Sequence, residues 1–339
     1  MIRTPFDQPP AEGTAITVAP GVLWMRLPLP MKLDHVNVYA LQDDEGWTIV
    51  DTGFDSPQAR AIWQGLLDGP LAGQPVVRVI GTHHHPDHIG LAGWFMERGA
   101  DLWISRTAWL MARMLVLDVQ DRASPQALAF WRRAGMPPEM LDLRAAERPF
   151  NFADVVHPLP LGFTRLAQGD VVTFGRRRWR VAMGHGHAPC HATFWSLDDD
   201  LVIGGDQLLP SISPNLGVYP TEPEADPVGE WLDSCTRLRE LARPDQLVLP
   251  GHKLPFTGLP FRLDQLIANH RMALDRLAQA LTQGPRTAVG CFDILYRRRI
   301  GDGEFGLALV EAVAHLNHLH RAGVIGPVGE TGGAVLWGA

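Results

Sequence analysis

Four histidines and an aspartate fall within seven consecutive positions, residues 82–88, which read THHHPDH. In an extended or loop segment alternate side chains point the same way, so His83 and His85 can chelate one ion. His84 lies between them and is expected to point the other way and to bind nothing. The spacing therefore predicts a metal centre rather than a set of unrelated surface histidines.

The adjacent pair Asp87 and His88 offers an oxygen and a nitrogen further along the chain. This pair suits a second metal, roughly 3.5–4 Å from the first. Two ions need more than four ligands, and three later apolar runs end in ligand-type residues, namely His191 in HAPCH, Asp206 in VIGGD and His252 in VLPGH. A lone histidine is more often a hydrogen-bonded structural residue, but this combination points to one shared centre.

The elements that must position these residues are predicted by short apolar runs broken by Gly, Pro and Asp between about residues 15 and 105. The expected strands are ITVAPGVLWMRL, HVNVYAL, GWTIVDTG and VVRVIGTHHH, and helical spacing is found over 56–69 and in IGLAGWFMERG. Residues 106–148 are rich in helix formers and predict a helical insertion, after which strand patterns resume. The ligand-type residues therefore lie where strands end and loops build sites.

The last part of the chain changes to helix from Phe261 onward. A long apolar stripe in FRLDQLIANHRMALDRLAQAL predicts one helix, a short helix follows near 288–296, and a third runs over about 304–322. The tail GVIGPVGETGGAVLWGA could form two short strands around a Gly-rich turn. Three helices and a small hairpin are typical of a winged helix, so the predicted domains are 1–260 and 261–339.

The composition excludes several classes of protein. The chain has 339 residues and a net charge of −7, so no global field draws it to nucleic acid or to an anionic membrane. No stretch approaches 18 uninterrupted apolar residues. The three cysteines, Cys190, Cys235 and Cys291, lie far apart in the sequence and suggest no disulfide framework. This favours a reducing compartment. We expect a cytoplasmic protein with no membrane partner.

The motifs, taken together and in order, resemble those of the metallo-β-lactamase superfamily over about residues 15–260. The matching elements are Thr82 to His88 for T-H-x-H-x-D-H, Asp51-Thr52-Gly53 for D-T-G, His187 to His191 for H-[ST]-P-x-H, Gly205-Asp206 for G-D and Pro250-Gly251-His252 for P-G-H. The resemblance implies an α/β fold, an αββα sandwich with the site along one edge of its two sheets.

The resemblance also implies a ligand set for two divalent ions. Carried over position by position, the ligands are His83, His85 and His191 for the first ion, Asp87, His88 and His252 for the second, and Asp206 as a bridge. Zinc is the expected ion, with iron and manganese as alternatives. A hydroxide shared by the ions would be the nucleophile and Asp87 a proton carrier. His187 and Asp51 are expected to hold ligands or backbone rather than metal.

Two departures narrow the implied activity. Asp206 stands where the β-lactamases of the superfamily use Cys or Ser, and His85 stands where flavo-diiron proteins carry Glu. Persulfide dioxygenases lose the later ligands of the second metal, which this chain keeps. The remaining relatives are glyoxalase II-like thioesterases, lactonases and nucleases.

The predicted substrate is a small carboxylic ester, thioester or lactone with an apolar moiety. The insertion at 106–148 supplies Met and aromatic side chains for such a pocket, and Tyr219 is a candidate oxyanion donor. A metal-dependent phosphodiesterase or endoribonuclease is the alternative, and a non-catalytic DNA-binding sensor is a weaker one. Nucleic acid is disfavoured because the third helix carries one arginine, Arg321, and a homodimer is left open.

Overall fold

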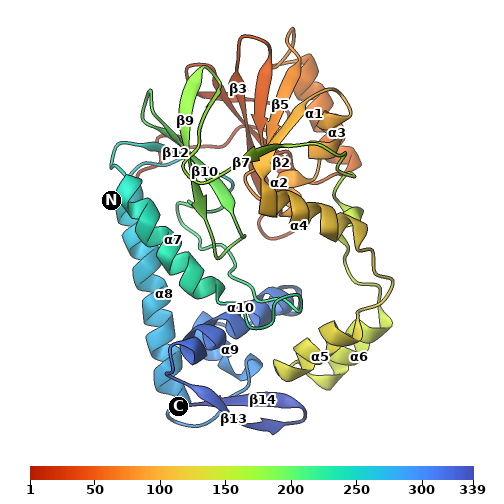
Figure 1. Cartoon of the computed structure of the whole chain (residues 1–339), viewed down its shortest axis with the longest axis vertical. Coiled ribbons are helices and arrows are strands. Elements are labelled where there is room, and N and C mark those ends of the chain that lie inside the picture. The colour runs from red at the N-terminus through yellow and green to blue at the C-terminus, as the bar shows by residue number, and fades with distance from the viewer. The chain divides into compact units, whose positions relative to one another are not determined.

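The computed structural model describes residues 1–339 and has three sheets (Figure 1). The seven-stranded sheet has the order β1-β2-β3-β4-β5-β6-β7, antiparallel up to β4 and parallel from β4 to β7. Its strands are β1 (Ile16–Ala19), β2 (Val22–Pro28), β3 (His35–Gln42), β4 (Trp47–Val50), β5 (Val76–Ile80), β6 (Asp101–Ser105) and β7 (Thr164–Leu166).

The second sheet has five strands in the order β12-β11-β10-β9-β8, with only β11 and β12 parallel. Its strands are β8 (Val171–Phe174), β9 (Arg177–Gly184), β10 (His191–Ser196), β11 (Leu201–Gly205) and β12 (Leu247–Pro250). A separate antiparallel hairpin consists of β13 (Gly326–Thr331) and β14 (Ala334–Gly338).

Helices occupy the connections between the strands. They are α1 (Pro57–Asp68), α2 (Pro86–Ile89), α3 (Ala92–Met96), α4 (Arg106–Leu117), α5 (Pro125–Arg133), α6 (Pro138–Ala146), α7 (Pro227–Leu241), α8 (Leu259–Leu281), α9 (Phe292–Tyr296) and α10 (Asp302–Arg321), with 3₁₀ turns η1 (Phe152–Asp154) and η2 (Val289–Cys291). Ser56, Ser105 and Ser124 cap α1, α4 and α5, because each hydroxyl accepts a hydrogen bond from the backbone N–H three residues on.

The seven-stranded sheet has a hydrophobic core on each of its two faces, as the side chains of β3 show. Alternate side chains of a strand face opposite ways, so Val36 and Val38 pack in a core with residues of α1, α3 and α4. Tyr39 and Leu41 instead pack in a second core, together with side chains from the five-stranded sheet such as Phe194. The two sheets are therefore stacked face to face, and the expected α/β sandwich is confirmed at this level.

Most predicted elements are present, but the helix expected after His88 is broken. It consists of α2 and α3, which are separated around Gly90. A Cβ at Gly90 would lie 2.3 Å from the carbonyl oxygen of Gly53 and 2.6 Å from that of Pro86. Gly90 keeps helical angles (φ −54°, ψ −41°), so it is the close approach of the backbones that requires glycine here.

The chain forms two compact units that are not continuous segments. The first contains residues 1–119, 151–214 and 238–263, and the second contains 120–150, 215–237 and 264–339. The second unit is therefore larger than the predicted domain 261–339, since α5 and α6 of the expected insertion belong to it while α4 belongs to the first unit. No helix is both long and apolar enough to cross a bilayer.

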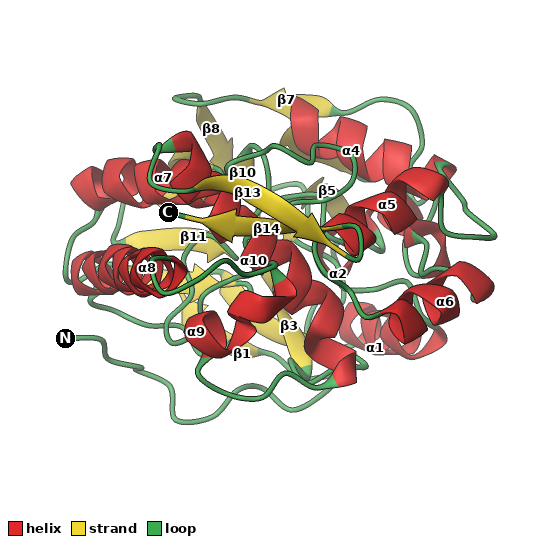
Figure 2. Cartoon of the chain, turned by 90° about the horizontal axis from the view of Figure 1, so that it is seen from below, coloured by secondary structure: helices red, strands yellow, loops and turns green.

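The second unit has its own core around α8, α9 and α10. The stripe predicted on the third helix is buried at Phe305, Leu309 and Leu316, and the β13–β14 hairpin lies beside α10 (Figures 1 and 2). The ring of Trp337 in β14 meets that of His320 in α10 at a centroid distance of 5.5 Å. Helices and hairpin occur as predicted, whereas their assignment as a winged helix stays a prediction.

Candidate metal centre

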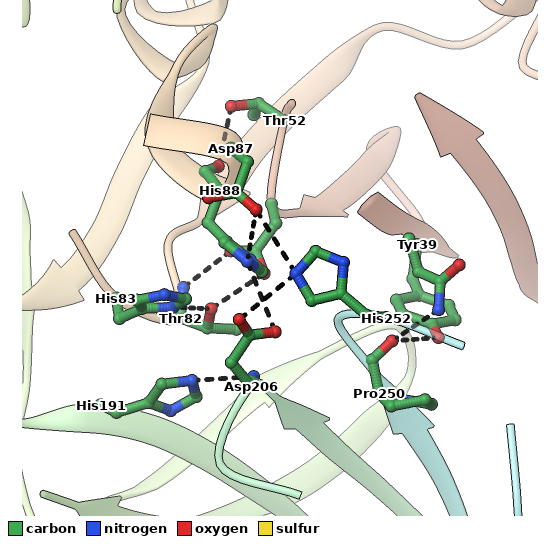
Figure 3. A network of polar contacts seen from close by, with 12 residues as sticks. Tyr39, Thr52, Thr82, His83, Asp87, His88, His191, Asp206, Pro250 and His252 are labelled. Atoms are coloured by element: carbon green, nitrogen blue, oxygen red, sulfur yellow. Dashed lines mark hydrogen bonds and ion pairs between the residues drawn. The ribbon is translucent and has the colours of Figure 1, made fainter. Parts of the chain in front are cut away.

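Histidines and aspartates from several strand ends of the first unit converge on one place (Figure 3). The residue 82–88 motif follows β5, Asp206 follows β11 and His252 follows β12. His187 lies in the turn between β9 and β10. Strands of both sheets thus position the cluster from residues that are far apart in sequence.

Three groups of side chains place their ligand atoms within 4.8 Å of one another. They are His83, His85 and His187; His83, His88 and Asp206; and Asp87, His88 and His252. Because His83 and His88 each occur in two groups, the three form one connected cluster. His84 is in none of them, as the alternation of side chains predicts, and its ring stacks near that of Phe152 instead.

The distances within the cluster are those of metal ligands rather than of hydrogen bonds. His88 Nε2 lies 3.5 Å from Asp87 Oδ2 and 3.5 Å from Asp206 Oδ1. His252 Nε2 lies 3.4 Å from Asp87 Oδ2 and 3.3 Å from Asp206 Oδ2. Four ligands at tetrahedral angles, each about 2.1 Å from a zinc ion, are separated from one another by roughly 3.4 Å.

Several of these atoms lack any hydrogen-bond partner although they are buried. His83 Nε2, His88 Nε2 and Asp206 Oδ1 are examples. A buried polar atom without a partner is costly, and three aimed into one cluster need a common partner. A divalent ion meets that need, because imidazole nitrogen and carboxylate oxygen are ligands that zinc accepts. The residues present therefore fit the expected metal.

Asp51 fixes the orientation of the motif loop from the end of β4. Its Oδ2 accepts a hydrogen bond from His88 Nδ1 at 2.7 Å and from the Thr82 hydroxyl at 2.8 Å, while its Oδ1 accepts from the Thr82 N–H at 2.9 Å. Asp51 has a left-handed φ of 58°, which Asp tolerates better than most residues. With Nδ1 of His88 bound in this way, its Nε2 faces the cluster. The interpretation of Asp51 as an anchor is confirmed.

His252 is held by backbone contacts that reach back to β3. Its Nδ1 donates to the carbonyl oxygen of His35 at 2.7 Å, which leaves Nε2 for the cluster. The side-chain amide of Asn37 donates to the carbonyl oxygens of Pro250 (2.9 Å) and Lys253 (2.7 Å), and the Tyr39 hydroxyl also donates to Pro250 (2.8 Å). Sequence reasoning missed Asn37, because it lies in a strand 213 residues from the turn that it holds.

Glycine at 251 is required by the close packing of the centre. A Cβ there would lie 2.2 Å from Asp206 Oδ1 and 2.8 Å from His88 Cε1. The Gly251 N–H also donates to the Gly205 carbonyl oxygen at 2.8 Å. The P-G-H sequence therefore lets the backbone approach the two ligands directly.

His191 and His187 both lie at the cluster, but only one of them is in the three groups. His191 is in none of them, since its Nε2 accepts a hydrogen bond from the Asp206 N–H at 3.1 Å, although its ring stacks on that of His83 at a centroid distance of 4.6 Å. His187 is grouped with His83 and His85, and its Nε2 lies 3.4 Å from Asp206 Oδ2. The assignment of His191 to the first ion stays a prediction.

Cys190 and Tyr219 are in none of the three groups. Cys190 is half-buried, has a φ of 52° and donates its N–H to His185 Nδ1 at 3.3 Å. Tyr219 belongs to the second unit and its side chain is 47% exposed. Its assignment as an oxyanion donor stays a prediction.

The electrostatics of the cluster separate its histidines into two kinds. Burial lowers the pKa of His83 and of His85 well below the usual value, so both stay neutral as ligands must. Burial also acts against a charge on His252, but Asp206 and Asp87 outweigh it and raise its pKa to about 10. The same carboxylates and Asp51 raise the pKa of His88. An incoming cation therefore replaces protons on these two histidines.

Comparison with known proteins decides the family. The model of the metallo-beta-lactamase superfamily matches residues 31–252, and that of the metallo-beta-lactamase-like C-terminal domain matches residues 274–333. The chain belongs to the metallo-β-lactamase superfamily. The superfamily match spans every residue of the three ligand groups.

Individual superfamily members resemble the chain over nearly its whole length. It is 38% identical to a beta-lactamase domain protein from Burkholderia ambifaria, with a TM-score of 0.91 over 99% of this chain and 98% of that one. A metallo-beta-lactamase family protein from Thermus thermophilus, TTHA1429, is 29% identical, with a TM-score of 0.78 over 95% and 99%. The probable metallo-hydrolase YqjP of Bacillus subtilis is 25% identical over 88% of this chain and 92% of its own length. The chain is a metallo-hydrolase of this superfamily with a candidate His/Asp metal site.

Proposed function

We propose that the protein is a dinuclear metal-dependent hydrolase of a carboxylic ester, thioester or lactone with an apolar moiety. The observation that carries the proposal is the position of Asp206. Its Oδ1 faces His88, while its Oδ2 lies within 3.4 Å of both His187 and His252. A carboxylate whose two oxygens face both groups of histidines is suited to bridge two ions.

The proposed ligand set takes His187 in place of His191. The proposed ligands are His83, His85 and His187 for one ion, Asp87, His88 and His252 for the other, and Asp206 for both. Zinc is proposed, and iron and manganese fit the same nitrogen and oxygen donors. Such ions polarise a carbonyl oxygen and lower the pKa of bound water to about 7.

The chain's own residues position the reaction and move its protons. Asp87 has its carboxylate within 3.5 Å of both His88 and His252 and is the proposed proton carrier. Burial alone would raise its pKa, but the two histidines lower it, so the carboxylate is ionised. Tyr219 is proposed as the oxyanion donor, and Tyr219→Phe would test it by lowering kcat with KM nearly unchanged.

An apolar substrate is supported by helix α4 of the first unit. Leu110, Met114 and Leu117 are spaced along one helical face and are 53%, 46% and 68% exposed. Apolar side chains that remain exposed in such a row suit contact with an apolar partner or substrate. Methionine in particular adapts its shape to different acyl groups.

A substrate panel tests the proposal. The zinc-loaded protein would be offered p-nitrophenyl acyl esters, acyl thioesters, homoserine lactones, bis-p-nitrophenyl phosphate and single-stranded RNA. Turnover of an acyl substrate, lost in Asp206→Asn and retained in the exposed control Asp44→Asn, is the expected result. Turnover of the phosphodiester and RNA alone would replace the proposal by a nuclease, and no turnover by a fully loaded sample would overturn it.

Metal content tests the dinuclear part separately. Elemental analysis of the freshly purified, unchelated protein is expected to give two ions per chain, and one ion in Asp206→Asn. His187→Gln should lower the content more than His191→Gln, because only His187 joins a ligand group. Equal losses in both variants would contradict the revised ligand set.

A further inference from the structure

The second unit contains a cavity of about 630 Å³ that the metal chemistry does not use. Its walls come from α5, from the C-terminal half of α10 and from the β13–β14 hairpin, all within the second unit. No residue of the three ligand groups lines it. Its size falls within the range of about 300–1,000 Å³ of small-molecule sites.

Part of the cavity lining is apolar, and the elements that carry it are held in place. Phe130 of α5, Val313 of α10 and Trp337 of β14 line it. The backbone of Trp337 exchanges two hydrogen bonds with Arg286, at 3.0 and 2.9 Å, which fixes β14. Helix α5 is tied to the same unit through the Ala134 carbonyl oxygen, which accepts from the Val289 N–H at 3.1 Å. The apolar wall is therefore preformed.

The charged residues of the cavity lining carry an excess of positive charge. Its charged lining residues are two arginines, Arg133 and Arg321, and one glutamate, Glu224. Asp226 attracts Arg321, but its carboxylate already bonds His318 at 3.0 Å and the Gly229 N–H at 2.9 Å. The guanidinium of Arg321 thus keeps donors for another acceptor.

We propose that this cavity binds a small organic monocarboxylate with an aromatic or branched apolar body. Its carboxylate bonds Arg133 and Arg321, since a guanidinium pairs in a planar, two-pronged manner with carboxylate oxygens. The apolar body packs against Phe130, Val313 and Trp337. Two cations against one anion give a net charge of about +1, which suits one negative charge rather than two or more. This inference does not rest on the proposed hydrolysis.

Calorimetric titration of the full-length protein with 2-naphthoate tests the site, with the uncharged 2-naphthamide as the matched probe. One equivalent of naphthoate is expected to bind, at least tenfold more tightly than the amide. Arg133→Gln and Arg321→Gln should each weaken naphthoate at least tenfold. Arg299→Gln is the control, because Arg299 is exposed in the same unit and does not line the cavity.

Two further measurements separate this site from the metal centre. Treatment with a chelator should leave naphthoate binding unchanged, whereas its loss would place the probe at the metals. Val313→Trp should abolish naphthoate binding by filling the cavity. If that variant fails to fold, the affinities of Arg133→Gln and Arg321→Gln decide whether the proposal holds. Equal affinity for the amide, insensitivity to both arginines, or no binding at millimolar concentration would each overturn the proposal.

Discussion

At the scale of single residues, the orientation of His88 and His252 depends on the hydrogen bond that Nδ1 of each ring makes. Asp51 accepts from Nδ1 of His88 and the His35 carbonyl from Nδ1 of His252, so both Nε2 atoms face the cluster. Such contacts typically change metal affinity 10–100-fold when they are lost. Substitution of the residues that bond these histidines should therefore change metal affinity measurably.

Asp51→Asn is expected to weaken zinc binding by about 10–100-fold. The amide is almost the same size and tolerates the left-handed backbone at this position, but it removes the negative charge that holds His88 and Thr82. Competition with a chromophoric chelator measures the affinity. Asp55→Asn serves as control, since Asp55 bonds Arg60 instead of a ligand. An unchanged affinity would show that the loop is held without this carboxylate.

Metal binding is expected to release protons at pH 7.5. The pKa of His252 is raised to about 10 and that of His88 is also raised, so both are protonated in the metal-free protein and must lose a proton to bind zinc. The raised pKa of His252 stabilises the metal-free fold fully below pH 6.5, and this contribution is lost as the pH rises to about 10. Zinc affinity should therefore increase with pH across this window.

Calorimetry in buffers of different ionisation enthalpy counts the released protons. His252→Asn should release fewer protons than the unaltered protein. If the measured enthalpy did not depend on the buffer, the histidines would be neutral before binding and the expectation would be wrong.

The sequence predicts most members of the cluster because their spacing is local. His83, His85, Asp87 and His88 follow from one loop, and the period of side chains separates His84 from them. The place of His187 beside His83 and His85 could not be predicted in this way. It depends on how the turn between two strands folds, as does the hydrogen bond from the Asp206 N–H to His191, and neither has a local signature.

At the scale of elements, the turn after β12 is fixed by a buried polar side chain in β3. Asn37 is 1% exposed and uses its amide on Pro250 and Lys253, while its Oδ1 accepts from the Trp24 indole at 2.9 Å. The antiparallel pairing of β2 with β3 places Trp24 near Asn37. Through this network, the position of His252 depends on strands β2 and β3.

Asn37→Leu is expected to destabilise the fold by several kcal/mol and to weaken zinc binding. The change leaves buried groups of Trp24, Pro250 and Lys253 without a partner, at about 1–3 kcal/mol each, although Tyr39 still bonds Pro250. Urea unfolding of the metal-free protein measures the loss. Gln42→Leu, at the other end of β3, is the matched control, and equal stability of the two variants would contradict the role of Asn37.

Helices and strands could be predicted because the spacing of apolar residues that indicates them extends over only a few residues. The stripe on α10 and the hairpin after it occur as expected. The close approach of Gly90 to the Gly53 carbonyl was not predicted, since it depends on a contact across the fold. The features that the sequence did not predict are thus those decided by long-range packing.

At the scale of the whole molecule, the two units share the chain in alternating segments. The boundary lies at residues 119, 150, 214, 237 and 263. Composition and periodicity could not predict this, because 120–150 and 215–237 are ordinary helical and loop sequences that acquire their place through tertiary contacts. The cytoplasmic location remains a prediction, and the homodimer stays an open alternative.

The alternation of segments limits how the gene can be divided. A stop codon after position 263 would cut helix α8 and leave residues 120–150 and 215–237 without the rest of their unit. Such a chain is expected to bind a hydrophobic dye and to be degraded quickly by trypsin, whereas the full-length protein resists. A truncated protein that is equally resistant would contradict this expectation. Removal of the residues after 263 therefore does not remove the second unit as a whole, because two of its three segments lie before that point.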